Sequence, residues 1–535
     1  MVMQTTAKTK ELIDNLKSTC AAYGLGNDGN EFKIITQSFL YKFMNDKFAH
    51  RIKQVDKNLA KAESWEEVLS TYSEEQYNLL LLQLGPKTPK LKPVHFLSYL
   101  HNHQNDEQFA KLFDDTLRDI ALFNNEIFSV KTANSKVILF DELSLYIADH
   151  SERDAFCRAV VNKLVNFSFE DVFGEKYDFF ATIFEYLIKD YNSDSGGKYA
   201  EYYTPHAVAR IMAAILVNEK VKGVKVYDPS AGSGTLLMNI AHAIGEDNCS
   251  IYSEDISQKS STMLRLNLVL NNLSHSIPHI IKGNTILEPY YREEKFDYIV
   301  SNPPFKLDFS DFRADLDKDI NKTRFFAGIP KVPAAKKESM AIYLLFIQHI
   351  MHSLSPTGKA AVVVPTGFIT AQSGIEKKIR EQLVERGWLR GVVSMPSNIF
   401  ASTGTNVSVL FMDRQADNEH IVLVDAGKLG ETVKDGKNQR TVLTRTEEQD
   451  IIDAMNKKEA KEDFAVVVSR EEIKAKNYSF SAGQYFEVRI DYVDITAEEF
   501  AEKMEGYQTT LQDYFTQSAK LEREILEQLG GLRYA

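Results

Sequence analysis

Between residues 204 and 415, apolar segments of strand length alternate with segments that have helical periodicity. A helix is expected to start at Thr204 and Pro205, as N-cap and first helical residue. Further helices are expected at 235–244, 263–273 and 341–354, and strands at VKVYD (224–228), SIYSED (250–255), HIIKGN (279–284), FDYIVSNPP (296–304), KAAVVVP (359–365), LRGVVSM (389–395) and NVSVLFM (406–412). Such alternation predicts a mostly parallel, doubly wound α/β sheet that binds ligands at the carboxyl ends of its strands.

The regions on either side of this alternation have a helical pattern. Residues 1–160 show apolar residues three and four positions apart, which predicts an N-terminal helical domain. The α/β domain is assigned to 161–490. Residues 491–535 are polar, free of proline and spaced for one or two amphipathic helices, which predicts a C-terminal helical tail for subunit assembly.

Composition narrows the class of protein. The chain is 44% hydrophobic and 26% charged, which is typical of a soluble globular protein. Its apolar runs are too short to span a bilayer, and no export signal is expected. Three cysteines without metal-ligand spacing fit a reducing cytoplasm and argue against a disulfide framework or a metal site. A net charge of -12 argues against a protein that grips nucleic acid unaided, so another chain would supply much of any DNA contact.

The segment DPSAGSG, 228–234, joins a strand to a helix. Gly232 and Gly234 allow close approach of backbone N–H groups to a ligand. The third glycine of the dinucleotide fingerprint is absent, because Leu237 stands there. Asp228 would repel a pyrophosphate, so the loop favours a cationic or amine-bearing ligand.

An acid also ends the following strand, where Glu254 and Asp255 stand. An acid about 20 residues after the glycine loop of a nucleoside-binding sheet accepts hydrogen bonds from ribose hydroxyls. Together with the glycine loop, this feature favours an adenosine-containing cofactor.

The strand at 296–301 ends in Asn302, Pro303, Pro304 and Phe305. The Asn302 side-chain oxygen and the Pro303 carbonyl are two acceptors held stiffly by consecutive prolines. They suit the two N–H groups of an exocyclic amine, and Phe305 offers a ring on which a flat base can stack.

DPSAGSG and NPPF resemble the cofactor and catalytic motifs of S-adenosylmethionine-dependent amino-methyltransferases that act on DNA. The segments YYTP, RFFAGIP and MPSNIFASTGTNVSVLFM resemble the modification subunit of type I restriction-modification systems, most strongly over about residues 165–415. The resemblance implies a Rossmann-like methyltransferase sheet and S-adenosylmethionine as cofactor, without a metal. The family often has Asp facing the cofactor's adenine where this chain has Asn284. The site residues that it implies are Glu201, Tyr202, Tyr203, Thr204, Pro205, Asp228, Ser230, Ala231, Gly232, Ser233, Gly234, Glu254 and Asn284 for the cofactor, and Asn302, Pro303, Pro304 and Phe305 for catalysis.

The function implied is N6-adenine methylation of double-stranded DNA by base flipping. N4-cytosine methylation is an alternative, although enzymes of that kind more often carry Ser at the first catalytic position. Methylation of RNA guanine or of protein glutamine, and a non-catalytic scaffold, are others.

About 120 residues follow position 415, too few for a large target-recognition module, and no nuclease cluster or P-loop is recognisable. Specificity is therefore expected to come from another chain. The family resemblance implies double-stranded DNA and a specificity subunit flanked by two copies of this chain as partners, with a restriction subunit as an optional further one.

Overall fold

A computed structural model describes residues 2–26, 29–85, 88–124, 130–131, 136–137, 140–170, 173, 204–400, 406–415, 419–435, 438–486 and 495–531. The chain divides into two compact units, Met1–Tyr485 and Phe486–Ala535. The predicted boundary near residue 160 stays a prediction. None of the described helices is long and apolar enough to cross a membrane.

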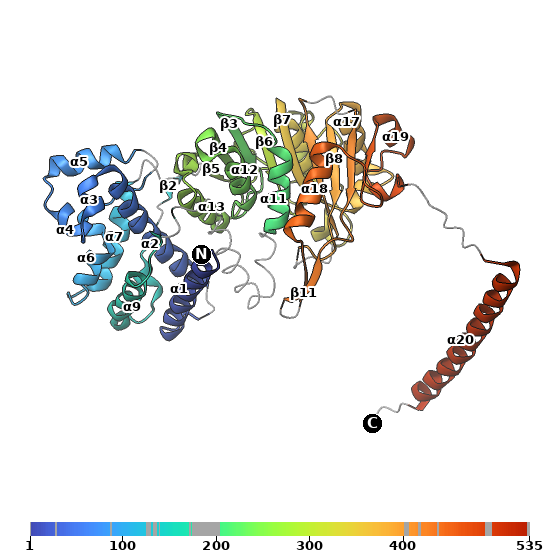
Figure 1. The fold of residues 1–535 in the computed structure, drawn as a ribbon, viewed down its shortest axis with the longest axis horizontal. Coiled ribbons are helices and arrows are strands. Elements are labelled where there is room, and N and C mark those ends of the chain that lie inside the picture. Colours follow the sequence, from blue (N-terminus) through green and yellow to red (C-terminus); the bar gives the residue numbers. More distant parts are fainter. Residues whose placement is uncertain are drawn as a thin grey trace. The chain divides into compact units, whose positions relative to one another are not determined.

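A nine-stranded sheet organises the described part of the first unit (Figure 1). Its strand order is β13-β10-β8-β9-β7-β6-β3-β4-β5. The strands are β3 (Val224–Asp228), β4 (Cys249–Asp255), β5 (Ile280–Lys282), β6 (Phe296–Ser301), β7 (Leu354–Pro365), β8 (Leu389–Ser394), β9 (Val407–Asp413), β10 (Ile421–Asp425) and β13 (Ala465–Val468). Strands β5, β4, β3, β6 and β7 are parallel, and β9 runs antiparallel between β7 and β8.

Helices cover both faces of this sheet. Residues 360–364 in β7 are completely buried although their side chains alternate between the two faces, so neither face is open to water there. Helix α11 packs on α12 and on α18, and α15 packs on β7 and α17. The helices are α11 (His206–Leu216), α12 (Thr235–Ile244), α13 (Gln258–Leu270), α14 (Arg313–Leu316), α15 (Tyr343–Ser353), α16 (Gly367–Thr370), α17 (Gly374–Glu385), α18 (Arg445–Lys457) and α19 (Arg470–Ala475).

The structure confirms the strands and helices expected between residues 204 and 415, with one correction at a helix start. Pro205, not Thr204, is the N-cap of α11, and Thr204 makes no capping bond there. The strands β10 and β13 and the hairpin of β11 (Glu431–Asp435) with β12 (Asn438–Val442) lie beyond residue 415, where the sequence pattern is weak.

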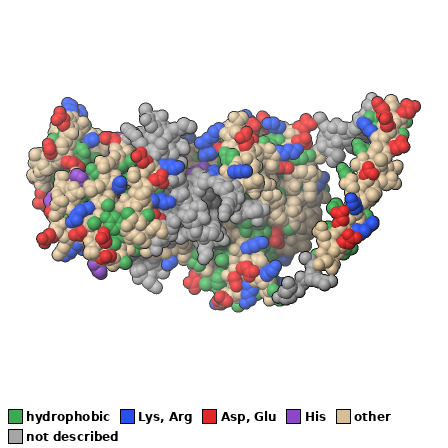
Figure 2. Space-filling model, turned by 90° about the horizontal axis from the view of Figure 1, so that it is seen from below, with side chains coloured by type: hydrophobic (Ala, Val, Ile, Leu, Met, Phe, Trp, Pro, Cys, Tyr) green, Lys and Arg blue, Asp and Glu red, His purple; other side chains and the backbone are tan. Residues whose placement is uncertain are grey.

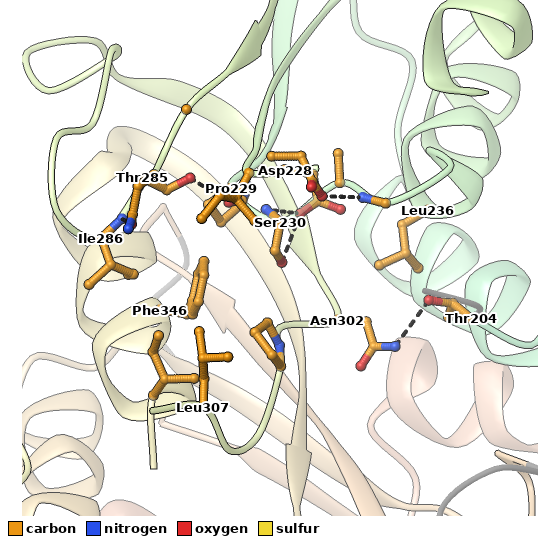
Figure 3. Close-up of a pocket in the computed structure, with 18 of the residues that line it drawn as sticks. Thr204, Asp228, Pro229, Ser230, Leu236, Thr285, Ile286, Asn302, Leu307 and Phe346 are labelled. Carbon is orange, nitrogen blue, oxygen red and sulfur yellow. Dashed lines mark hydrogen bonds between the residues drawn. The ribbon is translucent and has the colours of Figure 1, made fainter. Parts of the chain in front are cut away.

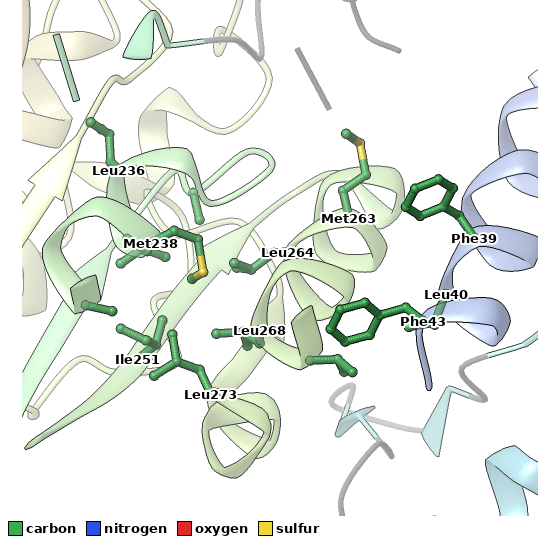
Figure 4. Packing of buried hydrophobic residues seen from close by; sticks show 14 of the residues in the cluster. Phe39, Leu40, Phe43, Leu236, Met238, Ile251, Met263, Leu264, Leu268 and Leu273 are labelled. Carbon is green, nitrogen blue, oxygen red and sulfur yellow. The ribbon is translucent and has the colours of Figure 1, made fainter. Parts of the chain in front are cut away.

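The first 165 residues are mainly helical, as expected. The described helices are α1 (Val2–Ala22), α2 (Gly29–Val55), α3 (Lys57–Lys61), α4 (Trp65–Ser70), α5 (Glu74–Gln83), α6 (Leu97–Asn102), α7 (Phe109–Phe123) and α9 (Arg153–Val165), with a short pair of strands, β1 (Val130–Lys131) and β2 (Lys136–Val137). Phe39 and Phe43 of α2 share one hydrophobic cluster with Met263 and Leu268 of α13 (Figure 4). This helical region therefore packs directly on the helical layer of the sheet.

The described part of the second unit is one helix, α20 (Ala497–Gly531), together with residues 486, 495 and 496, which precede it. None of its residues is buried within the unit. Its large apolar side chains are exposed, and Phe515 and Leu526 are more than half exposed. The C-terminal helical tail expected from the sequence is thus a single, continuous helix.

Candidate active site

The glycine loop and the Asn-Pro-Pro-Phe segment meet because their strands are neighbours. β3 and β6 pair in parallel, so their carboxyl ends at Asp228 and Ser301 lie at the same edge of the sheet. The hydroxyls of Ser230 and Ser301 are 2.7 Å apart. Two motifs some seventy residues apart in sequence therefore form one site (Figure 3).

The glycine loop needs its two glycines for different reasons. Gly232 and Gly234 have φ angles of 53° and 86°, in the left-handed region that favours glycine. A Cβ atom at Gly234 would lie 2.2 Å from Leu264 Cδ1, so any larger residue would force this leucine side chain to move. The Gly232 N–H donates to Asp255 Oδ2 at 2.9 Å, which fixes the loop to the end of β4.

A cavity opens above this edge of the sheet. Of the sequence-predicted residues, nine line it: Thr204, Asp228, Ser230, Ala231, Gly232, Ser233, Asn284, Asn302 and Pro304. Pro205, Gly234, Glu254, Pro303 and Phe305 do not line it. Glu201, Tyr202 and Tyr203 lie outside the described residues.

The cavity has an acidic character. Asp228 and Asp255 line it, whereas no Lys, Arg or His among the described residues does. Burial raises the pKa of Asp228 to about 8, and burial also raises the pKa of Asp255. Buried carboxyl groups of this kind are stabilised as anions by a positively charged ligand, so the cavity suits a cation.

Glu254 has a different place from the one predicted. Its carboxylate is fully buried and accepts hydrogen bonds from the Tyr227 hydroxyl and the Tyr290 N–H, both at 2.6 Å. Since successive side chains of a strand point to opposite faces, Glu254 enters the core while Asp255 reaches the cavity. The acid available to a ligand at the end of β4 is therefore Asp255.

Asn302 lies where the cavity meets the start of α11. Its side-chain Nδ2 donates to the Thr204 hydroxyl at 3.2 Å (Figure 3). Phe305 is half-buried and contacts Tyr343 edge to face, with ring centroids 6.2 Å apart. Tyr343 makes a similar contact with Phe368, so Phe305 belongs to a short row of aromatic rings beside the cavity.

Asn284 holds a turn at the far side of the cavity. Its Oδ1 accepts hydrogen bonds from the N–H groups of Ile286 and Leu287 at 3.2 and 3.1 Å. The Thr285 hydroxyl donates to the Pro229 carbonyl at 2.7 Å, which joins this turn to the glycine loop. The Asn284 oxygen is thus engaged by the backbone, and the amide N–H₂ is the group that remains for a ligand.

Sequence reasoning missed most of the apolar wall. Ile256, Ile286, Leu307, Phe312, Ile342 and Phe346 line the cavity, from four separate segments. Their only signal is that they are apolar and close in sequence to a polar motif, which does not distinguish them from core residues. Among the described residues, no group of three or more His, Cys, Asp or Glu side chains could hold a metal ion.

Comparison with known proteins agrees with this geometry. The family model of the N-6 DNA methylases matches residues 175–491. A type I restriction enzyme MpnII methylase subunit from Mycoplasma pneumoniae is 27% identical over 435 residues, which are 77% of this chain and 73% of that protein. The HindI methylase subunit from Haemophilus influenzae is 25% identical over 79% of this chain and 93% of its own length.

Among solved structures, the methyltransferase subunit of a type I restriction-modification system from Streptococcus thermophilus has a TM-score of 0.70. It is 23% identical and covers 91% of this chain and 100% of its own. This likeness supports the methyltransferase fold.

The sheet, the glycine loop and the Asn-Pro-Pro-Phe segment define an amino-methyltransferase. The chain belongs to the N-6 DNA methylase family, and its enzyme class is adenine-specific DNA methyltransferase. The fold class and the family expected from the sequence are confirmed.

Proposed function

We propose that this chain is the modification subunit of a type I restriction-modification system and transfers a methyl group from S-adenosylmethionine to N6 of adenine in double-stranded DNA. The observation that carries the proposal is the position of Asn302 at the edge of an acidic cavity built on the glycine loop. The names of the matching methylase subunits support the same assignment.

The residues of the cavity fit the proposed cofactor. S-adenosylmethionine carries a sulfonium and an ammonium group, and the two charged residues that line the described cavity are both acids. Asp228 would accept hydrogen bonds from the ammonium group, and Asp255 would accept them from the ribose hydroxyls. Ile256, Ile286 and Phe346 offer apolar surface to the adenine ring. When bound, the cofactor supplies an electrophilic methyl group.

The catalytic segment would hold the target base beside that cavity. The Asn302 Oδ1 and the Pro303 carbonyl would accept the two N–H groups of the adenine amine and direct its lone pair toward the cavity. Because the Asn302 Nδ2 donates to Thr204, its Oδ1 is left available for the target. Phe305 would stack on the flipped base.

Assembly with a specificity subunit is part of the proposal. Acidic and basic side chains are interspersed on the face seen in Figure 2, and the net charge is -12, so this chain offers weak electrostatic attraction for DNA. Exposed apolar residues of α20 recur three, four or seven positions apart: Phe500, Met504, Tyr507, Leu511, Tyr514, Leu521 and Ile525. This spacing forms a stripe that a partner helix would cover, and the helical spacer of a specificity subunit is the proposed occupant.

The stoichiometry of two such chains per specificity subunit, a possible restriction subunit and a cytoplasmic location belong to the same proposal. The three cysteines are buried and form no disulfide, which is consistent with a reducing compartment.

The test is methyl transfer by the purified complex. The chain is co-purified with its specificity subunit and incubated with radiolabelled S-adenosylmethionine and duplex DNA that contains the target site. Label in the DNA, lost when Asn302 is replaced by Ala, supports the function. Label-free DNA with a folded, assembled complex contradicts it.

A further inference from the structure

The RFFAGIP segment, 324–330, contributes no residue to the cavity lining, yet its first side chain is deeply buried. Arg324 is 2% exposed. Its guanidinium donates to the carbonyl oxygens of Thr285 and Ile286 at 3.1 and 2.5 Å and to Asn321 Oδ1 at 3.0 Å. Thr285 and Ile286 line the cavity, so Arg324 holds the backbone of its wall from behind.

The same segment is also attached to helix α15. The Ala327 N–H donates to Gln348 Oε1 at 2.8 Å, and Gln348 Nε2 donates to the Gly328 carbonyl at 3.0 Å. Gln348 lies on α15, which also carries Phe346 into the cavity. The segment therefore connects two walls of the cavity that come from distant parts of the sequence.

Apolar packing reinforces this connection. Phe325 shares a hydrophobic cluster with Ile286 of the turn and Phe346 of α15. The Arg324 guanidinium lies 4.2 Å from the centroid of the Phe325 ring. The turn, the RFFAGIP segment and α15 thus form one packed unit behind the apolar wall.

The chemistry of Arg324 suits a geometric task. Burial lowers the pKa of its guanidinium to about 10, so the group stays charged at neutral pH. A charged side chain is costly to bury unless its donors are satisfied; both terminal nitrogens of Arg324 donate hydrogen bonds, whereas its buried Nε has no partner among the described residues. Its planar fork can reach two consecutive carbonyl oxygens at once, which the single ammonium of a lysine cannot do with the same geometry.

We propose that Arg324 is a positioning residue that fixes the Asn284–Ile286 turn against α15 and thereby sets the adenine side of the cofactor cavity. The proposal rests on the proposed use of S-adenosylmethionine. It assigns to RFFAGIP a role in selecting the nucleoside of the cofactor.

The test compares Arg324→Lys with Arg390→Lys. Arg390 is a matched control because it is also buried and donates to a carbonyl, that of Ile215 at 2.7 Å, and to Asn456 Oδ1 at 2.6 Å, away from the cavity. Binding of S-adenosylmethionine to the full chain is measured by calorimetry, and folding by thermal unfolding. Arg324→Lys should weaken binding about tenfold, as expected for the loss of charge-assisted hydrogen bonds. Arg390→Lys should stay within about twofold of wild type at a similar loss of thermal stability.

A second measurement separates positioning from general stability. S-adenosylhomocysteine and its inosine counterpart differ only at the purine edge. In the wild type, the Kd of the inosine ligand divided by the Kd of S-adenosylhomocysteine should exceed one. This ratio should fall toward one in Arg324→Lys. Should Arg324→Lys not fold, Asn321→Ala, which removes an acceptor that orients the guanidinium, should lower the same ratio. Equal weakening of both ligands, or binding like that of Arg390→Lys, would overturn the positioning role. Absence of S-adenosylmethionine binding in the wild type would instead contradict the proposed function.

Discussion

The Asn302 side-chain amide donates to the Thr204 hydroxyl at 3.2 Å, and the two residues are 98 positions apart. The bond joins the start of α11 to the end of β6. It orients the amide so that its oxygen, the acceptor that we propose for the target amine, is not used by Thr204. Thr204 therefore orients the side chain of Asn302, the proposed catalytic residue, and also lines the cavity.

Replacement of Thr204 tests this orientation. Thr204→Val keeps the shape and removes the acceptor, so methyl transfer by the assembled complex should slow by roughly fivefold to tenfold, the value of one hydrogen bond of about 1 kcal/mol. Thr204→Ser retains the hydroxyl and should have near wild-type turnover. Equal rates for the Val and Ser variants in a single-turnover assay would argue against the orientation.

Replacement of Asn302 separates catalysis from cofactor binding. Asn302→Ala should lower the rate of methyl transfer by about a hundredfold or more, because a transition-state acceptor is lost. Calorimetry should show S-adenosylmethionine bound with nearly unchanged affinity. Wild-type turnover in this variant would remove Asn302 from the catalytic assignment.

Gly232 should be intolerant of a side chain. Gly232→Val should abolish cofactor binding, because its φ is 53° and the residue lines the cavity. Gly223→Val is the matched control, since Gly223 has a φ of 67° and open space around its Cβ position. The control should lose stability but keep its affinity in the same calorimetric titration. Loss of binding in both variants would show that backbone strain alone is responsible.

The pH dependence of cofactor binding should follow Asp228. Its pKa of about 8 means that the carboxyl is mostly protonated at pH 7, whereas an ammonium ligand needs the carboxylate. Affinity should therefore rise between pH 6 and 8, by at most about tenfold per pH unit, and level off above pH 8. Calorimetry in buffers of different ionisation enthalpy should detect proton release on binding. Asp228→Asn should bind the cofactor weakly, and its affinity should not change between pH 6 and 8. If its affinity rose with pH as in the wild type, a group other than Asp228 would be responsible for the pH dependence.

The raised pKa of Asp228 should also make the free energy of unfolding depend on pH. Because the folded-state pKa of Asp228 lies above its unfolded value near 4, the folded protein holds this proton more tightly. This carboxyl group therefore lowers the free energy of unfolding progressively as pH rises from about 4 to 8. In Asp228→Asn, this part of the pH dependence of chemical denaturation should disappear.

The apolar stripe of α20 should be required for assembly. Leu511→Glu together with Ile525→Glu should prevent co-purification with the specificity subunit, because charges would be buried at the interface. Thr509→Glu, on the opposite side of the helix, should assemble normally. The double variant and the Thr509→Glu variant should both bind S-adenosylmethionine as the wild-type chain does. A complex that still forms after deletion of the residues beyond about 495 would exclude the helix as the docking element.

The elements that could be predicted from the sequence are those whose residue pattern lies within one short segment of the chain. The strand, glycine loop and helix at 224–244 have their periodicity and turn residues within one short segment, and the Asn-Pro-Pro-Phe segment follows its strand directly. Glu254 was misplaced because two adjacent acids end β4, and only strand pairing decides which one faces the cavity. The antiparallel position of β9, and the roles of Phe346 and Arg324, depend on contacts between distant segments and have no local signature.

The most direct test of the account is identification of the methylated base. DNA treated with S-adenosylmethionine and the complex of this chain with its specificity subunit is digested to nucleosides and analysed by mass spectrometry. We expect N6-methyladenine, and its loss with Asn302→Ala. Detection of N4-methylcytosine alone, or of methylated RNA or protein without methylated DNA, would contradict it.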